Sequence, residues 1–192
     1  YEVVVDATSG DIGAGKGVGV FRMAFDATTT LQTSQSVSVG LDYARSLRWQ
    51  NTSATPVNDQ YIRILSTGCG TDCGPDDVYR IRFYETTFAI PRFNVSSGQA
   101  TVLLIQNPTA YDADGNAYFW NAAGLLLSTQ PFSVPDHGLY SLNAGSVAAL
   151  VGQSGTITVS HNARYGDLVG KAVALEPATG FSFDTPMVWR PR

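Results

Sequence analysis

The chain has 192 residues, of which 44% are hydrophobic and only 15% charged, and its formal net charge is -4. Soluble domains usually carry about a quarter charged residues, so this surface must be built mainly from Thr, Ser, Asn, Gln and Gly, which excludes coiled coils and disordered chains. The negative charge gives no attraction to phosphate backbones, and no apolar run approaches the ~20 residues that span a bilayer. Neither nucleic acid binding nor membrane insertion is expected.

A predicted strand over residues 1–6 is followed by a Gly-rich segment. Residues 10–17 fit the phosphate-loop pattern except at the last position, where Gly17 replaces the hydroxyl residue that binds magnesium. A phosphate loop must also open a helix, whereas residues 18–25 have the alternation of a strand. The segment therefore predicts a loop or hairpin rather than a nucleotide site.

The two cysteines, Cys69 and Cys73, lie in a loop rich in Gly, Thr, Asp and Pro. Their spacing matches neither zinc nor thioredoxin motifs. We expect a local disulfide, and two free thiols in a reducing compartment are the less favoured alternative because exposed thiols are reactive. Together with a start at Tyr1 and no charged-then-apolar leader, this predicts a processed or excised piece of a secreted protein.

The segment over residues 78–84 alternates as a half-buried strand, with Tyr79, Ile81 and Phe83 on one face. The opposite face carries arginines beside a tyrosine, and neighbouring strands add further arginines and a tryptophan. These residues form a candidate ligand-binding face: Arg48, Trp49, Arg63, Arg80, Arg82 and Tyr84. A planar guanidinium beside an aromatic ring suits a sugar or a carboxylate, although the same pairing can simply cover the outer face of a sheet.

Most other apolar segments also have a period of two. They predict short strands at residues 36–39, 47–50, 61–65, 88–93, 101–106, 117–121, 125–129, 138–142, 156–160 and 172–175. Only residues 144–151 resemble a helical turn, and Pro91 favours an edge strand or a strand start. The pattern predicts an all-β fold of two consecutive antiparallel β-sandwiches, Ig-like or jelly-roll-like, over residues 1–86 and 87–192.

A candidate metal site follows in the second half. Asp112, Asp114 and Asn116 have the one-three-five spacing of a calcium loop, but Ala117 and Ala123 occupy positions that exclude an EF-hand. Calcium held by a sandwich loop stays open beside the simpler interpretation, an Asp-Gly turn. No other cofactor is predicted.

No catalytic arrangement emerges from the sequence. His137 belongs to a turn, and His161 follows a predicted strand, where we expect it to face solvent. Ser160 precedes His161, so the two side chains point to opposite faces and a site with Asp167 is not favoured. The chain is predicted not to be an enzyme.

Several segments of the second half carry a family resemblance: residues 90–93, residues 101–109, Gly124, Pro135 and residues 180–183. Over about residues 87–192 the chain resembles secreted bacterial β-sandwich modules similar to the sensory rhodopsin transducer-like fold. Through residues 76–82, the first half more loosely resembles prepeptidase C-terminal-type accessory domains. Neither family brings a catalytic residue, so the resemblance implies a non-catalytic extracellular module.

Two functions follow as hypotheses. The first is a structural or adhesive module at the cell surface or outside the cell, which assembles with itself or other surface proteins through edge strands or the terminal strand at residues 1–6. The second is a carbohydrate-binding module that holds glycans on the face of arginines and aromatic residues.

Overall fold

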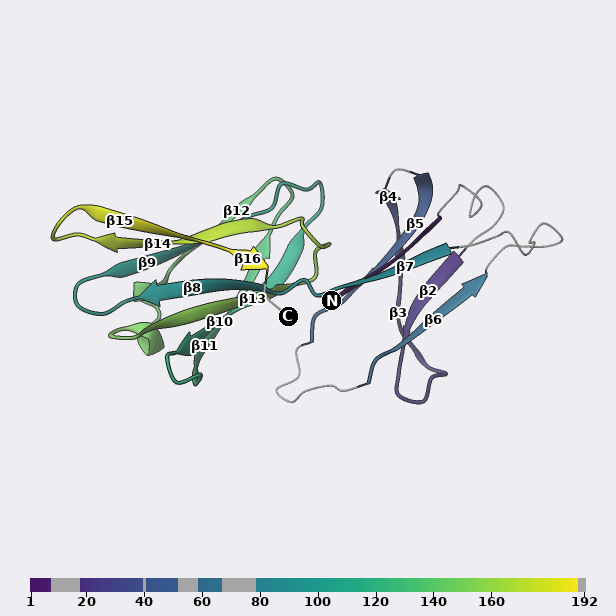
Figure 1. The fold of residues 1–192 in the computed structure, drawn as a ribbon, viewed down its shortest axis with the longest axis horizontal. Coiled ribbons are helices and arrows are strands. Elements are labelled where there is room, and N and C mark those ends of the chain that lie inside the picture. Colours follow the sequence, from purple (N-terminus) through teal and green to yellow (C-terminus); the bar gives the residue numbers. More distant parts are fainter. Residues whose placement is uncertain (8–17, 40, 52–58, 67–78, 190–192) are drawn as a thin grey trace. The chain divides into compact units, whose positions relative to one another are not determined.

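The computed structural model describes residues 1–7, 18–39, 41–51, 59–66 and 79–189 (Figure 1). Within them the regular elements are β-strands and two short 3-10 turns, with no α-helix, which confirms the all-β fold. The chain divides into two compact units, Tyr1–Glu85 and Thr86–Arg192.

The first unit is a sandwich of two antiparallel sheets, ordered β4-β5-β1-β7 and β3-β2-β6. The strands are β1 (Glu2–Ala7), β2 (Val18–Met23), β3 (Thr30–Thr33), β4 (Gln35–Val39), β5 (Leu41–Arg48), β6 (Tyr61–Ser66) and β7 (Tyr79–Tyr84). Strand β1 pairs with both β5 and β7, so the terminal strand lies inside its own sheet rather than at an edge.

Strand parity decides which side chains fill this sandwich. Val3 and Val5 point inward, while the alternate positions Glu2, Val4 and Asp6 point to the outer face of the four-stranded sheet. The buried core consists of Val3, Val5, Val20, Leu47 and Trp49, with Val18, Ile62 and Ile64 packed against it.

The second unit has sheets ordered β11-β10-β13-β8-β16 and β12-β9-β14-β15, again antiparallel. The strands are β8 (Phe88–Asn94), β9 (Ala100–Gln106), β10 (Ala113–Asn121), β11 (Leu126–Val134), β12 (Leu139–Asn143), β13 (Ser154–His161), β14 (Val169–Glu176), β15 (Phe181–Pro186) and β16 (Val188–Trp189). Its core includes Phe88, Ile90, Phe93, Leu103, Ile105, Phe119, Phe132, Leu150, Ile157 and Val159.

Some sequence expectations need correction. The predicted Asp-Gly turn is wrong, because Asp114 and Gly115 lie within β10. The predicted strand at 47–50 coincides only with the last two residues of β5, because β5 runs from Leu41 to Arg48, and strands β3, β15 and β16 were not predicted. The helical turn over 144–151 is two 3-10 turns, Ala144–Ser146 and Ala148–Leu150. Pro91 lies inside β8, which is not an edge strand because β16 pairs with its residues Phe88 and Ala89. The pairing of β8 with β13 shifts register beside Pro91, between the Ile157–Ile90 and Gly155–Phe93 pairs.

Candidate functional site

Four of the six predicted ligand-binding residues share the outer face of the four-stranded sheet. Arg80 and Arg82 lie on β7 and both contact Asp6 of β1. Arg80 Nε donates to Asp6 Oδ1 at 3.0 Å and its Nη2 to Oδ2 at 2.9 Å, and Arg82 Nη2 also donates to Oδ2. The Arg80 hydrogen bonds hold the pKa of Asp6 below its usual value. The charges of Arg80 and Arg82 are therefore largely compensated by Asp6 within the sheet.

Arg48 and Tyr84 lie one row further along the same face, on either side of Glu2. Glu2 is 2% exposed, and its Oε1 accepts a 2.6 Å hydrogen bond from Ser46 Oγ. The sequence interpretation missed both carboxylates of this face. Because they alternate with the arginines, this arrangement favours the interpretation that these residues cover and stabilise a sheet.

The other two predicted residues lie elsewhere. Trp49 is buried at one end of the sandwich, where Tyr1 stacks on it at 5.6 Å and the Arg22 guanidinium lies 5.4 Å from its ring centroid. Arg63 lies on the outer face of the three-stranded sheet, 5.1 Å from the Phe21 ring centroid. The six residues thus occupy three separate places in the first unit.

Acidification is expected to destabilise the first unit through Asp6. Since the pKa of Asp6 is lowered from 3.8 in the fold, its stabilisation is present above the unfolded pKa and is lost as the pH falls through the folded pKa. The variant Asp6→Asn should lose about 1 kcal/mol at pH 7, a modest amount because the Arg80 side chain is 53% exposed. It should also show a flatter fall in melting temperature from pH 5 to 2, measured by calorimetry.

The exposed Asp59 supplies the control for this pH series. Its side chain makes no ion pair with any described residue, so Asp59→Asn should keep the acid dependence of the parent chain. An Asp6→Asn variant with the parent's full acid dependence would contradict the assignment.

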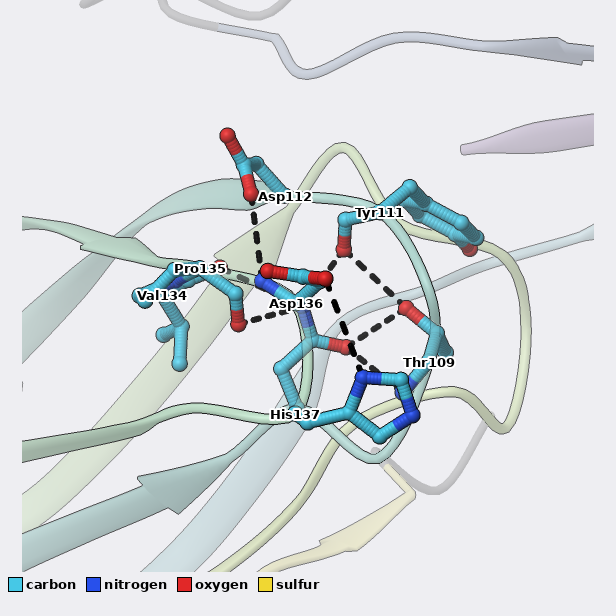
Figure 2. Close-up of polar contacts among 8 residues, drawn as sticks. Thr109, Tyr111, Asp112, Val134, Pro135, Asp136 and His137 are labelled. Carbon is cyan, nitrogen blue, oxygen red and sulfur yellow. Dashed lines mark hydrogen bonds and ion pairs between the residues drawn. The ribbon is translucent and has the colours of Figure 1, made fainter.

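Of the three predicted calcium residues, Asp112 belongs to a cluster of loop residues in the second unit (Figure 2). Asp112 Oδ1 accepts a 3.1 Å hydrogen bond from the Asp136 backbone N–H, and His137 Nδ1 lies 3.8 Å from Asp136 Oδ2. Asp114 and Asn116 instead occupy β10. Within the described part of the chain, no group of three or more His, Cys, Asp or Glu side chains could hold a metal ion.

Asn107 is fully buried beneath this cluster. Its Nδ2 donates to the carbonyl oxygens of Tyr111, Val134 and Pro135 at 2.6, 3.2 and 3.1 Å. Its Oδ1 accepts from the backbone N–H and the hydroxyl of Thr109. The Asn-Pro-Thr sequence predicts a turn, but the tertiary contacts reveal a side chain that joins two loops.

The expectation that His161 faces solvent is wrong. Strand β13 continues through His161, and parity places its ring in the core, stacked on Phe88 at 5.3 Å. The stack continues from Phe88 to Trp189 at 4.2 Å and on to Tyr165 at 4.0 Å. Ser160 is on the opposite face of β13, as predicted, so the two side chains do not point toward one another.

The edge strand β7 exposes apolar side chains. Among the described strands its neighbour is β1 alone. Ile81 is paired with Val5 and Phe83 with Val3, so both lie on the core-facing side of the sheet. They are nevertheless 37% and 61% exposed, and Tyr79 is 47% exposed. Among the described strands, β7 thus has a neighbour on one side only, and its apolar side chains are open to solvent.

Other predicted features fall outside the described residues. These include Cys69 and Cys73, so the disulfide stays a prediction, and residues 10–17. No helix in the described ranges is long and apolar enough to cross a membrane.

Comparison with known proteins assigns no family. No protein-family model and no curated protein matches the chain. A crystal structure of Thermotoga maritima 1070 resembles it with a TM-score of 0.48 and 12% identity, covering 55% of this chain and 94% of that one. This likeness is too weak to assign a fold family or a function.

Proposed function

We propose that the chain is a non-catalytic structural or adhesive module of an extracellular or surface-displayed protein, which associates with copies of itself through β7. The exposed apolar side of this edge strand carries the proposal. An unpaired edge is a template for another strand, and in most sandwiches charges, prolines or bulges at the edge strands prevent pairing with other chains. Arg80 and Arg82 offer little such protection, because both bond to Asp6.

The strand parity favours one register for the association. An antiparallel pair of β7 strands centred on Ile81 would continue the apolar side across both copies and place Tyr79 opposite Phe83 of the second copy. Each aromatic cross-strand pair is worth about 0.2–1 kcal/mol, and the two-fold arrangement forms each such pair twice. The contact would thus form a closed dimer by extending the four-stranded sheet.

The composition of the chain supports close association between copies. A surface poor in charge has little repulsion to oppose close association. The extracellular setting is proposed from the resemblance to secreted bacterial sandwich modules and from the predicted disulfide. Other surface proteins are proposed as further partners.

The variant Phe83→Lys tests the edge. Phe83 is already 61% exposed, so the unit should fold, while a lysine at this edge should weaken association at least about tenfold. The measurement is sedimentation velocity over a concentration series of the full chain.

Leu125→Lys is the matched control. It adds the same charge at a side chain that is 63% exposed, in the turn between β10 and β11, and should associate like the parent. A parent chain that stays monomeric at high concentration, or equal loss in both variants, would overturn the proposal.

A further inference from the structure

The outer face of the three-stranded sheet carries a second surface, which does not involve β7. Ile62 and Ile64 of β6 pack toward the core, so the alternate residues of that strand point outward. Strand β2 lies beside β6, with Phe21 opposite Arg63, and Phe25 follows at the end of β2. We call this surface the aromatic–arginine face: Phe21, Phe25, Tyr61, Arg63 and Leu65.

Three apolar members of this face are open to solvent, while Phe21 is half-buried. Phe25 is 80% exposed, and Tyr61 and Leu65 are each 40% exposed. The Phe25 and Tyr61 rings lie 6.0 Å apart with an interplanar angle of 77°, so they form two sides of a corner. Exposed aromatic rings of this kind provide a large apolar contact area at a low cost in side-chain entropy.

Arg63 differs from the other predicted arginines in its partners. Its guanidinium lies over Phe21, and Nη2 is 3.5 Å from the Thr30 hydroxyl oxygen, a long hydrogen bond. Among the described residues no carboxylate lies within 4.0 Å of Arg63, whereas Arg80 and Arg82 both bond to Asp6. Within the described part of the chain, the face therefore carries a positive charge that is not paired with an acidic side chain.

This combination identifies a class of ligand. A sugar ring can stack its C–H face on an aromatic ring, and a guanidinium fork matches a carboxylate in two-point contact. The hydroxyls of Thr30 and Thr33 lie on β3 in the same rows and add polar partners. We propose that the aromatic–arginine face binds an acidic saccharide, a chain of hexuronate units, with Arg63 at the carboxylate and Tyr61 under the sugar ring.

An anionic membrane is the competing partner for exposed aromatic residues beside an arginine. Asp26 follows Phe25, and its carboxylate accepts hydrogen bonds from the backbone N–H groups of Thr28 and Thr29 and from the Thr29 hydroxyl. These bonds lower the pKa of Asp26 to about 2. Insertion of Phe25 into an anionic membrane would bring this negative charge to the membrane surface, whereas a saccharide held at Arg63 and Tyr61 does not need to contact Asp26, which favours the saccharide.

The test titrates the full chain with a tetrasaccharide of galacturonate and, separately, with its neutral galactose counterpart. We expect chemical-shift changes to gather on β2 and β6, and the acidic ligand to bind at least about tenfold more tightly. Arg63→Gln should remove this preference, and Tyr61→Ala should weaken both ligands, while Tyr61→Phe should keep stacking and hence binding.

Arg92→Gln is the matched control, since Arg92 is an exposed arginine of the second unit that bonds to Gln99. It should bind the acidic tetrasaccharide like the parent, and so should Phe83→Lys, which separates this site from association through β7. The proposal is overturned if neither ligand binds, if the acidic ligand has no advantage, or if Arg92→Gln weakens binding as much as Arg63→Gln. Binding to phosphatidylserine vesicles that depends on Phe25, without saccharide binding, would also overturn it in favour of a membrane.

Discussion

Replacing Asn107 with alanine is expected to destabilise the second unit by about 3 kcal/mol. The substitution removes the donor to three carbonyl groups and the acceptor for Thr109, all at a fully buried position. Buried polar groups that lose their partners each cost about 1–3 kcal/mol, partly recovered where water enters. Hydrogen exchange of the β9 and β10 amides measures the loss, and the amides of β1 and β2 show whether it stays in one unit.

Two further variants test whether the loss of stability comes from the buried hydrogen bonds of Asn107. Asn107→Asp keeps an acceptor for Thr109 but turns a carboxylate toward three carbonyl oxygens, so it should be at least as destabilising. Asn121 makes comparable bonds on the surface, where its Oδ1 accepts from the Ala123 and Leu125 backbone N–H groups. Asn121→Ala should cost less than about 1 kcal/mol, and an equally small effect at Asn107 would disprove its role between the loops.

Gly115→Ala is expected to cost about 3 kcal/mol or more, or to prevent the second unit from folding. Gly115 lies in β10 between Phe132 of β11 and His161 of β13. An added Cβ would meet Phe132 Cζ at 2.3 Å and the Ser160 carbonyl oxygen at 2.3 Å. The phenyl ring can turn aside, but the carbonyl belongs to the neighbouring strand, so the sheet itself would have to shift.

This clash makes a specific rescue prediction. Adding Phe132→Leu to Gly115→Ala should restore only part of the stability in thermal unfolding, because the Ser160 carbonyl remains in the way. Gly124→Asn serves as the control, since Gly124 has a positive φ of 79° that asparagine accepts and no atom near the added Cβ. Full recovery by Phe132→Leu would show that only the side chain mattered.

The strand alternation predicted the parity of β7 correctly but not its burial. Ile81 and Phe83 do lie on the core-facing side, beside Val5 and Val3. They stay exposed because, among the described strands, β7 lies at the edge of its sheet and the opposing sheet has three strands against four. Alternation reports which side chains share a face, whereas cover from the second sheet depends on strand order, which is a long-range property.

Long-range strand order also explains what the sequence missed on the outer faces of the two sheets of the first unit. The sequence singled out Arg80 and Arg82, yet their partner Asp6 is 74 residues or more away along the chain. Arg63 was identified as well, but Phe21 and Phe25 come from β2 and the turn after it, and only the β2–β6 pairing brings them beside Arg63 and Tyr61. In the second unit, Asp114-Gly115 has the composition of a turn, and the fit of glycine beneath Phe132 keeps it in a strand.

The pairing of β16 with β8 bears on how the second unit forms during synthesis. Strand β8 is the first of this unit and β16 the last one described, so the Val188–Ala89 pair joins residues about a hundred positions apart. Until Trp189 leaves the ribosome, Phe88 lacks the ring that stacks on it, and the outer edge of β8 is open to other chains. A nascent chain halted before β16 should therefore recruit chaperones more strongly than one halted after it.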